Sequence, residues 1–201
     1  MLLRRIFASL MITLQRGFDA VVKLKVLLFD GIFCGIRFGE GCKFYGAPYF
    51  FQSTNGKIVI GNNCSFRSRE TSNMMGLNHR CMVSTSDATG NHPIIKIGDH
   101  CGFSGVSVWC FKSITIGDNV RIGANSLIID GEAHFDDPRT SAPESIVIED
   151  NVFVGADCII RKGVTIGKNS VVGIRSMVLH DIPANCVAVG NPAKVIKEIK
   201  P

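Results

Sequence analysis

The 201-residue sequence lacks long apolar runs, a dense set of large aromatic side chains and a strong charge imbalance. No charge-free apolar stretch reaches the ~18 residues of a membrane-spanning helix, which excludes a polytopic membrane protein. One Trp and two Tyr are too few for an aromatic binding platform. A net charge of +5 is too small for a nucleic-acid footprint and favours an anionic small molecule or a membrane surface as partner.

The eight cysteines contain no C-x-x-C pair, which argues against a zinc knuckle or a thioredoxin-type site. What the chain does have is 46% hydrophobic residues against 19% charged residues. That balance excludes intrinsic disorder and is enough for one domain with a real core and a short appendage.

The N-terminal segment differs from the rest of the chain, because residues 1–30 have the spacing of an amphipathic helix. Gly31 could end that helix. Five basic residues against two acidic ones give the segment a positive charge. A signal peptide fits poorly, since no A-x-A-like cleavage site follows and Arg16 closes the apolar run early. Two alternatives remain for residues 1–34: a helix that caps the main domain, or a basic helix on a membrane surface through residues 1–30. The apolar positions are Leu3, Ile6, Phe7, Leu10, Leu14, Phe18, Val21 and Val22.

A six-residue period runs through the remaining sequence. It is unbroken from Ile148 to Val178 and recurs from Ile116 to Ile128, with further copies at Ile60 and Ile97. The interval from Ile97 to Ile116 is one residue longer than three repeats. We interpret the interval from Ile60 to Ile97 as two coils plus one residue, and that from Ile128 to Ile148 as one coil plus two residues. The pattern therefore predicts coils of 18 residues with small insertions.

The period predicts a triangular prism in which each short strand places one aliphatic side chain inward. Three strands close one coil, and stacked coils pair their backbone groups above and below. The position four residues after each aliphatic residue should face inward near a corner, where only a small side chain fits. Reduced, buried cysteines at that position indicate a cytosolic protein. The cysteines that the rule places there are Cys42, Cys64, Cys101, Cys158 and Cys186.

The repeat [Ile/Val]-Gly-x-x-[small]-x over residues 58–196 resembles that of the hexapeptide-repeat acyltransferases. Residues 148–156 are similar to the family's I-G-D-N-V-W-I-G-A, with Glu149 for Gly and Phe153 for Trp. Residues 189–196 resemble the G-x-P-A-K/R-x-I ending of the sugar O-acetyltransferase branch, which includes maltose, galactoside, nodulation-factor and surface-polysaccharide acetyltransferases.

The resemblance implies an all-β fold, a left-handed parallel β-helix over residues 35–201 with a protruding loop at 129–147, an N-terminal helical segment and a short C-terminal tail. It also implies a homotrimer with its sites between subunits. The implied activity is a CoA-dependent O-acetyltransferase acting on a sugar hydroxyl, in a surface-polysaccharide unit or its precursor.

The protruding loop carries the expected catalytic base. Acyl transfer to an alcohol needs a group that takes the hydroxyl proton, and imidazole suits this near pH 7. The family's catalytic His lies in a D-x-x-x-H loop, and His134 occupies that place, although a plain surface histidine is the alternative. Asp130, Glu132 or a backbone carbonyl could orient its ring. Arg139 could shape the acceptor pocket or belong to a solvated turn.

Ser104 matches a position where the family places a polar side chain toward the acceptor, although a core corner serine is equally compatible with the sequence. For acetyl-CoA, the resemblance implies contacts at Ala156, Ile174, Leu179, His180, Lys194 and Lys197. The sequence departs from the family here. In the family's usual G-A-G-S, Ile174 replaces the Ala and Arg175 replaces the second Gly, and Leu179-His180 replaces T-K. Ile174 could crowd the pantetheine arm, while Arg175 could replace the lost lysine charge. Lys194 and Lys197 could also be a solvated tail.

No metal is expected, because no two histidines have the H-x4-H spacing of the zinc-binding left-handed β-helices. Two other functions stay open from the sequence. One is N-acylation of an amino sugar nucleotide, and the other is a non-catalytic β-helix scaffold. We expect a cytoplasmic protein, and residues 1–30 leave open a position at the inner membrane surface.

Overall fold

The computed structural model describes residues 2–134 and 136–200. Met1, Phe135 and Pro201, which fall in the predicted helix, loop and tail, lie outside the described residues, as do the side chains of residues 2–8. Three sheets of short strands form the faces of a prism. Sheet 1 holds β1 (Arg37–Phe38), β4 (Lys57–Ile60), β7 (Ile94–Ile97), β10 (Ser113–Ile116), β13 (Ile146–Ile148) and β16 (Thr165–Ile166).

Sheet 2 ends in a hairpin. It holds β2 (Lys43–Tyr45), β5 (Ser65–Arg67), β8 (Gly102–Ser104), β11 (Arg121–Ile122), β14 (Phe153–Val154), β17 (Val171–Val172), β19 (Cys186–Gly190) and β20 (Ala193–Glu198). Sheet 3 holds β3 (Tyr49–Phe51), β6 (Met82–Thr85), β9 (Ser107–Cys110), β12 (Leu127–Ile129), β15 (Ile159–Ile160) and β18 (Met177–Val178).

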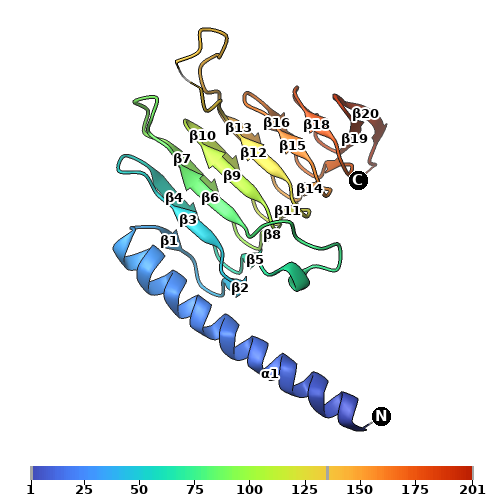
Figure 1. Cartoon of the computed structure of the whole chain (residues 1–201). Coiled ribbons are helices and arrows are strands. Elements are labelled where there is room, and N and C mark those ends of the chain that lie inside the picture. Colours follow the sequence, from blue (N-terminus) through green and yellow to red (C-terminus); the bar gives the residue numbers. More distant parts are fainter. Residues whose placement is uncertain (1, 135, 201) are drawn as a thin grey trace.

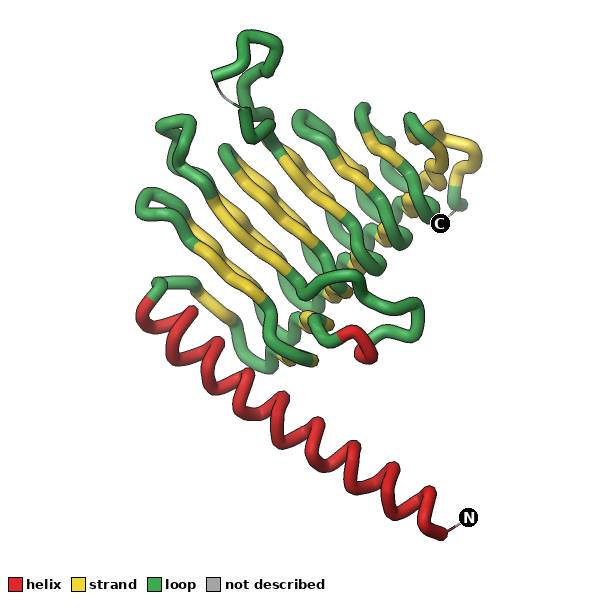
Figure 2. Tube along the Cα trace, in the orientation of Figure 1, coloured by secondary structure: helices red, strands yellow, loops and turns green. Residues whose placement is uncertain are grey.

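Successive strands of the chain visit the three sheets in turn, so each coil contributes one strand to each face (Figures 1 and 2). The paired strands are parallel except β19 and β20, which are antiparallel. A parallel strand one coil above supplies each backbone with hydrogen-bond partners, which the short strands lack within themselves. The left-handed parallel β-helix predicted from the repeat is confirmed.

The aliphatic ladder of sheet 1 fixes the register of the coils. Ile60 pairs with Ile97, which pairs with Ile116, and the ladder continues through Ile148 to Ile166. Two of the predicted intervals are therefore wrong. The 37 residues from Ile60 to Ile97 make one coil, not two, because two loops project from it. The interval from Ile128 to Ile148 is one strand step plus a long loop, since these residues lie on different sheets.

The corners place one residue of each turn in the left-handed backbone region. Nine non-glycine residues have positive φ, and each lies three positions after an inward aliphatic residue. Asn and Asp tolerate this region best, because their side chains can bond the local backbone. The two exceptions are His100 and Arg175, with φ of 59° and 58°. The others are Asn63, Asn119, Asn125, Asn151, Asp157, Asn169 and Asn185.

The five cysteines predicted to face inward are all buried, at 5% exposure or less. Their thiols bond carbonyl oxygens across the corner: Cys64 Sγ donates to Gly98 O at 3.1 Å, and Cys101 Sγ donates to Gly117 O at 3.0 Å. All eight cysteines are free. At the N-terminal end the prism is filled by larger side chains, with a stack of Phe44, Phe66 and Phe103 along sheet 2.

The predicted N-terminal helix is present as α1 (Leu2–Lys25), followed by a π-helical segment, η1 (Val26–Phe33). The helical part thus continues past Gly31. Val22 and Val26 are buried in the core at the first coil, and Asp19 bonds Gly46 N and Arg69. A short 3-10 turn, η2 (Glu70–Ser72), lies in the loop between β5 and β6. None of the described helices combines the length and apolarity needed to cross a membrane.

Candidate active site

The longest projection beyond the sheets at the edge joining sheet 3 to sheet 1 is the loop of residues 130–145, between β12 and β13 (Figure 1). Its first residue, Asp130, is fully buried. The Asp130 carboxylate accepts hydrogen bonds from the backbone N–H groups of Phe111, Lys112 and Ser113 at 2.6 to 2.9 Å. Asp130 therefore ties the root of the loop to the preceding coil.

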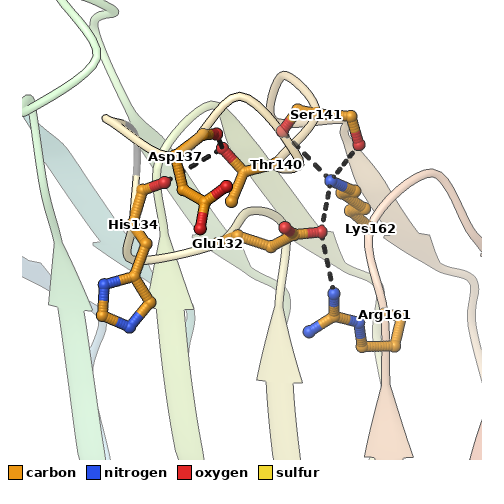
Figure 3. A network of polar contacts seen from close by, with 7 residues as sticks. All are labelled: Glu132, His134, Asp137, Thr140, Ser141, Arg161 and Lys162. Carbon is orange, nitrogen blue, oxygen red and sulfur yellow. Dashed lines mark hydrogen bonds and ion pairs between the residues drawn. The ribbon is translucent and has the colours of Figure 1, made fainter.

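A second anchor holds the loop to the following coil (Figure 3). Glu132 Oε1 accepts from Lys162 Nζ at 2.7 Å and from Arg161 Nη2 at 3.1 Å. Lys162 Nζ also donates to the main-chain oxygen of Ser141 at 3.1 Å, so one ammonium group joins both limbs of the loop. The hydrogen bond from Lys162 holds the pKa of Glu132 below its ordinary value.

His134 is exposed at the outer part of this loop, and its ring points away from the Glu132 cluster (Figure 3). Its main-chain oxygen accepts from Thr140 Oγ1 at 3.0 Å and from Asp137 N at 3.2 Å, which closes the tip of the loop. Within the described residues, no hydrogen bond holds the imidazole. Neither Asp130 nor Glu132 contacts it, because both carboxylates are committed to anchoring the loop.

Arg139 forms an ion pair inside the same loop. Its Nε and Nη2 donate to the Asp137 carboxylate at 2.5 to 3.2 Å. This contact lowers the pKa of Asp137 and raises that of Arg139. The Arg139 side chain is 89% exposed, so it stands at the loop surface beside His134 rather than inside a pocket of its own chain.

A groove of about 470 Å³ runs along sheet 2 toward its corner with sheet 3. Three residues predicted for two different substrates line it together: Ser104 from the acceptor side, and Ala156 and Ile174 from the CoA side. Ser104 is 9% exposed, Ala156 is buried, and Ile174 stands out with 61% of its surface exposed. The structure therefore joins these three positions, which are 18 and 52 residues apart, in one continuous depression.

The floor of the groove needs glycine. A Cβ at Gly123 would lie 2.5 Å from the backbone carbon of Gly155, and one at Gly155 would lie 2.7 Å from the backbone nitrogen of Ile174. Neither contact can be relieved by moving a side chain, because both partners are backbone atoms. Glycine at these two positions lets the backbones of successive coils stack closely at this corner.

Two arginines of the groove were missed by the sequence analysis. Arg67 and Arg121 line it from β5 and β11, together with Phe153 and Met75. Arg67 Nη1 donates to the main-chain oxygen of Ser72 at 3.1 Å and so holds the loop that carries Met75. Arg121 donates to the main-chain oxygen of His100. Little in the sequence indicates this position, because each arginine is the outward residue of a short strand, where charged side chains are common.

The other residues predicted for CoA lie elsewhere on the chain. Arg175 is exposed at the corner beside the groove, with Nε 3.6 Å from the Asp157 carboxylate. Leu179 and His180 follow β18 at the next corner and do not line the groove. Lys194 and Lys197 are exposed on β20, the last strand of the sheet that carries the groove. One chain therefore does not bring all the predicted residues together.

Three of the buried thiols are unsuited to act as nucleophiles, and the part of the chain that the structure describes offers no metal site. Burial raises the pKa of Cys81 and Cys158, and burial with the nearby Asp130 charge raises that of Cys110. These thiols stay neutral at physiological pH. Across residues 2–134 and 136–200, no group of three or more His, Cys, Asp or Glu side chains is placed to hold a metal ion.

Comparison with known proteins identifies the repeat. Residues 94–129 and 145–173 match the family model for the hexapeptide repeat of succinyl-transferase. Galactoside O-acetyltransferase of Escherichia coli is 44% identical over 91 residues, which are 43% of this chain and 45% of the relative. 2,3,4,5-tetrahydropyridine-2,6-dicarboxylate N-acetyltransferase of Staphylococcus aureus is 39% identical over 84 residues, 42% of this chain and 33% of the relative. The chain thus matches less than half the length of these relatives.

The fold is also found among solved structures. The N-acyltransferase AntD from Bacillus cereus, in complex with dTDP and 3-hydroxybutyryl-CoA, superposes with a TM-score of 0.64 at 18% identity. The match covers 83% of this chain and 85% of AntD. At this identity the likeness speaks for the shared β-helix architecture.

Proposed function

Because the chain belongs to the hexapeptide-repeat acetyltransferase family, we propose that it transfers an acetyl group from acetyl-CoA to a sugar hydroxyl. The acceptor in this proposal is a unit of a surface polysaccharide or its precursor. The observation that carries the proposal is the groove on sheet 2, which gathers Ser104, Ala156 and Ile174. The relatives that support an acetyl donor include a galactoside O-acetyltransferase.

The groove fits the shape and charge of acetyl-CoA. It runs across β5, β8, β11 and β14 of sheet 2, an elongated shape that suits the thin pantetheine arm. Arg121 lines it, and Arg175, Lys194 and Lys197 lie exposed at or beyond its C-terminal end, where cations suit phosphates. Ile174 narrows the groove at the corner. When bound there, acetyl-CoA supplies the acetyl group as a thioester.

His134 is the proposed general base. It accepts the proton of the acceptor hydroxyl as that oxygen bonds to the acetyl carbon, and it returns the proton to the departing thiolate, so the imidazole ends neutral. Ser104 provides a hydroxyl that could donate to the oxygen on which negative charge develops. The rigid β-helix and the two loop anchors at Asp130 and Glu132 hold the base in place.

A homotrimer follows as part of the proposal. The loop with His134 leaves the corner between sheets 3 and 1, whereas the groove lies on sheet 2. Three prisms packed side by side would set the loop of one subunit against the groove of the next. Within residues 2–134 and 136–200 the imidazole has no hydrogen-bond partner, which supports this arrangement, because a base needs an acceptor hydroxyl and an orienting group.

The eight free thiols favour the reducing cytoplasm as the compartment. The N-terminal helix supports a position at the inner membrane surface, which would suit a lipid-linked acceptor.

Transfer to an amine is the second candidate, since the Staphylococcus aureus relative is an N-acetyltransferase. A screen of paired acceptors that differ only in a hydroxyl or an amino group, with the acetylated product identified by mass spectrometry, separates the two. We expect acetylated alcohols. Exclusive acetylation of amines would replace the proposal with the second candidate, and a protein that binds no CoA ester would be a scaffold.

A further inference from the structure

The helical segments at the N-terminus leave a large apolar surface uncovered. Twelve of the twenty-two exposed large apolar side chains recorded for the described residues lie between residues 10 and 33. Val21 is 66% exposed and Phe33 is 78% exposed. Exposed apolar side chains in this number mark an interaction site, because soluble monomers rarely expose more than about 300–600 Å² in one apolar patch. The members are Leu10, Met11, Ile12, Leu14, Phe18, Val21, Leu24, Leu27, Leu28, Phe29, Ile32 and Phe33.

Part of this surface faces away from the β-helix. Successive residues advance by roughly 100° around a helix axis, so Leu10, Val21 and Leu24 lie on the side opposite the buried Val22 and Val26. Figure 1 shows α1 crossing the first coil and continuing past it toward the N-terminus. The uncovered face therefore forms the outer surface of that end of the molecule.

The charges on the same segment are sorted by sign. Both of its acids, Asp19 and Asp30, are bound internally. Asp19 lies 2.9 Å from Arg69 Nη1 and accepts from Gly46 N, and Asp30 is buried and paired with Lys25 Nζ at 2.8 Å. The basic residues Arg16 and Lys23 are instead exposed. The described part of α1 therefore presents positive charge to solvent, because both of its neighbouring acids are already paired.

Arg16 and Lys23 also meet a third cation across a depression. A groove of about 240 Å³ between α1 and β2 is lined by Arg16, Lys23 and Lys43, with Phe44 and Tyr45 beside them. Asp19 also lines the groove, but its carboxylate is held by Arg69 and Gly46. Three cations around one depression suit a phosphate group.

We infer that α1 and η1 dock the protein on an anionic lipid surface. The apolar side chains enter the boundary between headgroups and acyl chains, and the groove lined by Arg16, Lys23 and Lys43 takes a headgroup phosphate. A helix that exposes an apolar face with basic residues on its flank, and that is too polar to span the bilayer, lies in the interface plane. The inference extends the proposed location and is independent of the acetyl-transfer chemistry.

The test is sedimentation of the full chain with vesicles, without acetyl-CoA or acceptor, so the result does not depend on the proposed activity. Vesicles of phosphatidylcholine are compared with vesicles that contain about one third phosphatidylglycerol. We expect the protein to sediment with the anionic vesicles and to be released as the salt concentration rises. Equal sedimentation with both kinds of vesicle, or with neither, contradicts the inference.

Two sets of substitutions separate the parts of the surface. Replacing Arg16, Lys23 and Lys43 together by Gln should weaken binding roughly a hundredfold. Each basic residue near an anionic surface strengthens binding by about fivefold, and the three factors multiply. The matched control replaces Lys57 and Lys96, two exposed lysines on sheet 1, by Gln and should change binding by less than about threefold. If both sets weaken binding equally, general charge and not the groove is responsible.

The apolar set replaces Leu14, Val21 and Leu24 by Ser and should abolish binding to the anionic vesicles. Its control replaces Phe51 and Met82, exposed apolar residues of sheet 3, by Ser and should bind as the unchanged protein does. Far-UV circular dichroism checks that α1 persists. If the unchanged protein ignores vesicles but forms larger assemblies that the apolar set dissolves, a second copy covers this face and the inference is wrong.

Discussion

The carboxylate of Glu132 lies 2.7 Å from the ammonium group of Lys162, thirty residues further along the chain and one coil higher in the prism. Lys162 also reaches the main-chain oxygen of Ser141 on the returning limb of the same loop. With Asp130 buried at the root, the loop that carries His134 is tied to the coils on both sides. The exposed imidazole is therefore held on a supported segment and not on a free one.

Replacing His134 with Ala should lower kcat by about 10²- to 10⁴-fold, because that is the usual contribution of a general base. The melting temperature should not change, since the side chain is exposed. His92→Ala is the matched control, because His92 is also exposed and lies in a neighbouring loop between sheets 3 and 1. Steady-state kinetics with a fixed acceptor measures both. A kcat within tenfold of the unchanged enzyme for His134→Ala would remove this residue from the mechanism.

Glu132→Ala should lower kcat with little loss of global stability. The ion pairs are partly exposed and screened by solvent, so their contribution to the stability of the fold is small. Small displacements of a catalytic group can still cost up to about a hundredfold in rate. Proteolysis within residues 130–145 should become faster. The charge-reversed pair Glu132→Lys with Lys162→Glu should recover much of the lost activity, and an exchange that recovers nothing would show that Glu132 acts in another way.

The same anchor predicts a pH dependence. The pKa of Glu132 lies below its ordinary value of 4.5, so its stabilising contact is complete above that value and is lost as pH falls through the lower, folded-state pKa. The protection of the loop amides from hydrogen exchange, relative to an unfolded peptide at the same pH, should persist down to about pH 5 and fall at lower pH. In Glu132→Gln this transition should disappear. An unchanged profile in that variant would place the titrating group elsewhere.

Asp130→Ala should destabilise the fold by about 3–5 kcal/mol, because it leaves three buried or partly buried backbone N–H groups without their carboxylate acceptor. Asp136→Ala, an exposed acid of the same loop, should stay within about 0.5 kcal/mol of the unchanged protein. Urea unfolding compares the two. If Asp130→Ala lost activity while keeping its stability, the carboxylate would act on His134 after all.

Ile174→Ala should tighten acetyl-CoA binding by about tenfold, since Ile174 projects into the groove where the resembling family has Ala. Because the position is exposed, the stability should change by less than about 0.5 kcal/mol. Met82→Ala on sheet 3 serves as the control and should bind as before. Weaker binding in Ile174→Ala would mean that the side chain contacts the ligand favourably.

The repeat made the coils predictable, because one inward aliphatic residue and one small corner residue recur every six positions. Cys64 and Cys101 were placed correctly by that rule alone. The interval from Ile60 to Ile97 was misjudged, since a residue count gives the phase of the repeat but not whether the extra residues form a coil or loops. Because every coil has the same sequence pattern, the pattern alone does not show where a loop has been inserted.

The candidate site was predictable only where local sequence carries it. The D-x-x-x-H pattern led to His134, and the resemblance to the sugar O-acetyltransferases led to Ala156 and Ile174. The roles of Asp130 and Glu132 could not be read from the sequence, because their partners lie on the coils below and above. Arg67 and Arg121 meet at the groove only through the stacking of β5, β8 and β11.

The measurement that tests the central claim most directly is calorimetric titration of acetyl-CoA into the purified protein. It needs no acceptor, and the eight thiols do not disturb it as they would a thiol-release assay. The proposed groove predicts saturable binding near one site per chain, with a micromolar Kd. Absence of saturable heat at about 1 mM acetyl-CoA would contradict the acetyltransferase account and leave the β-helix as a scaffold.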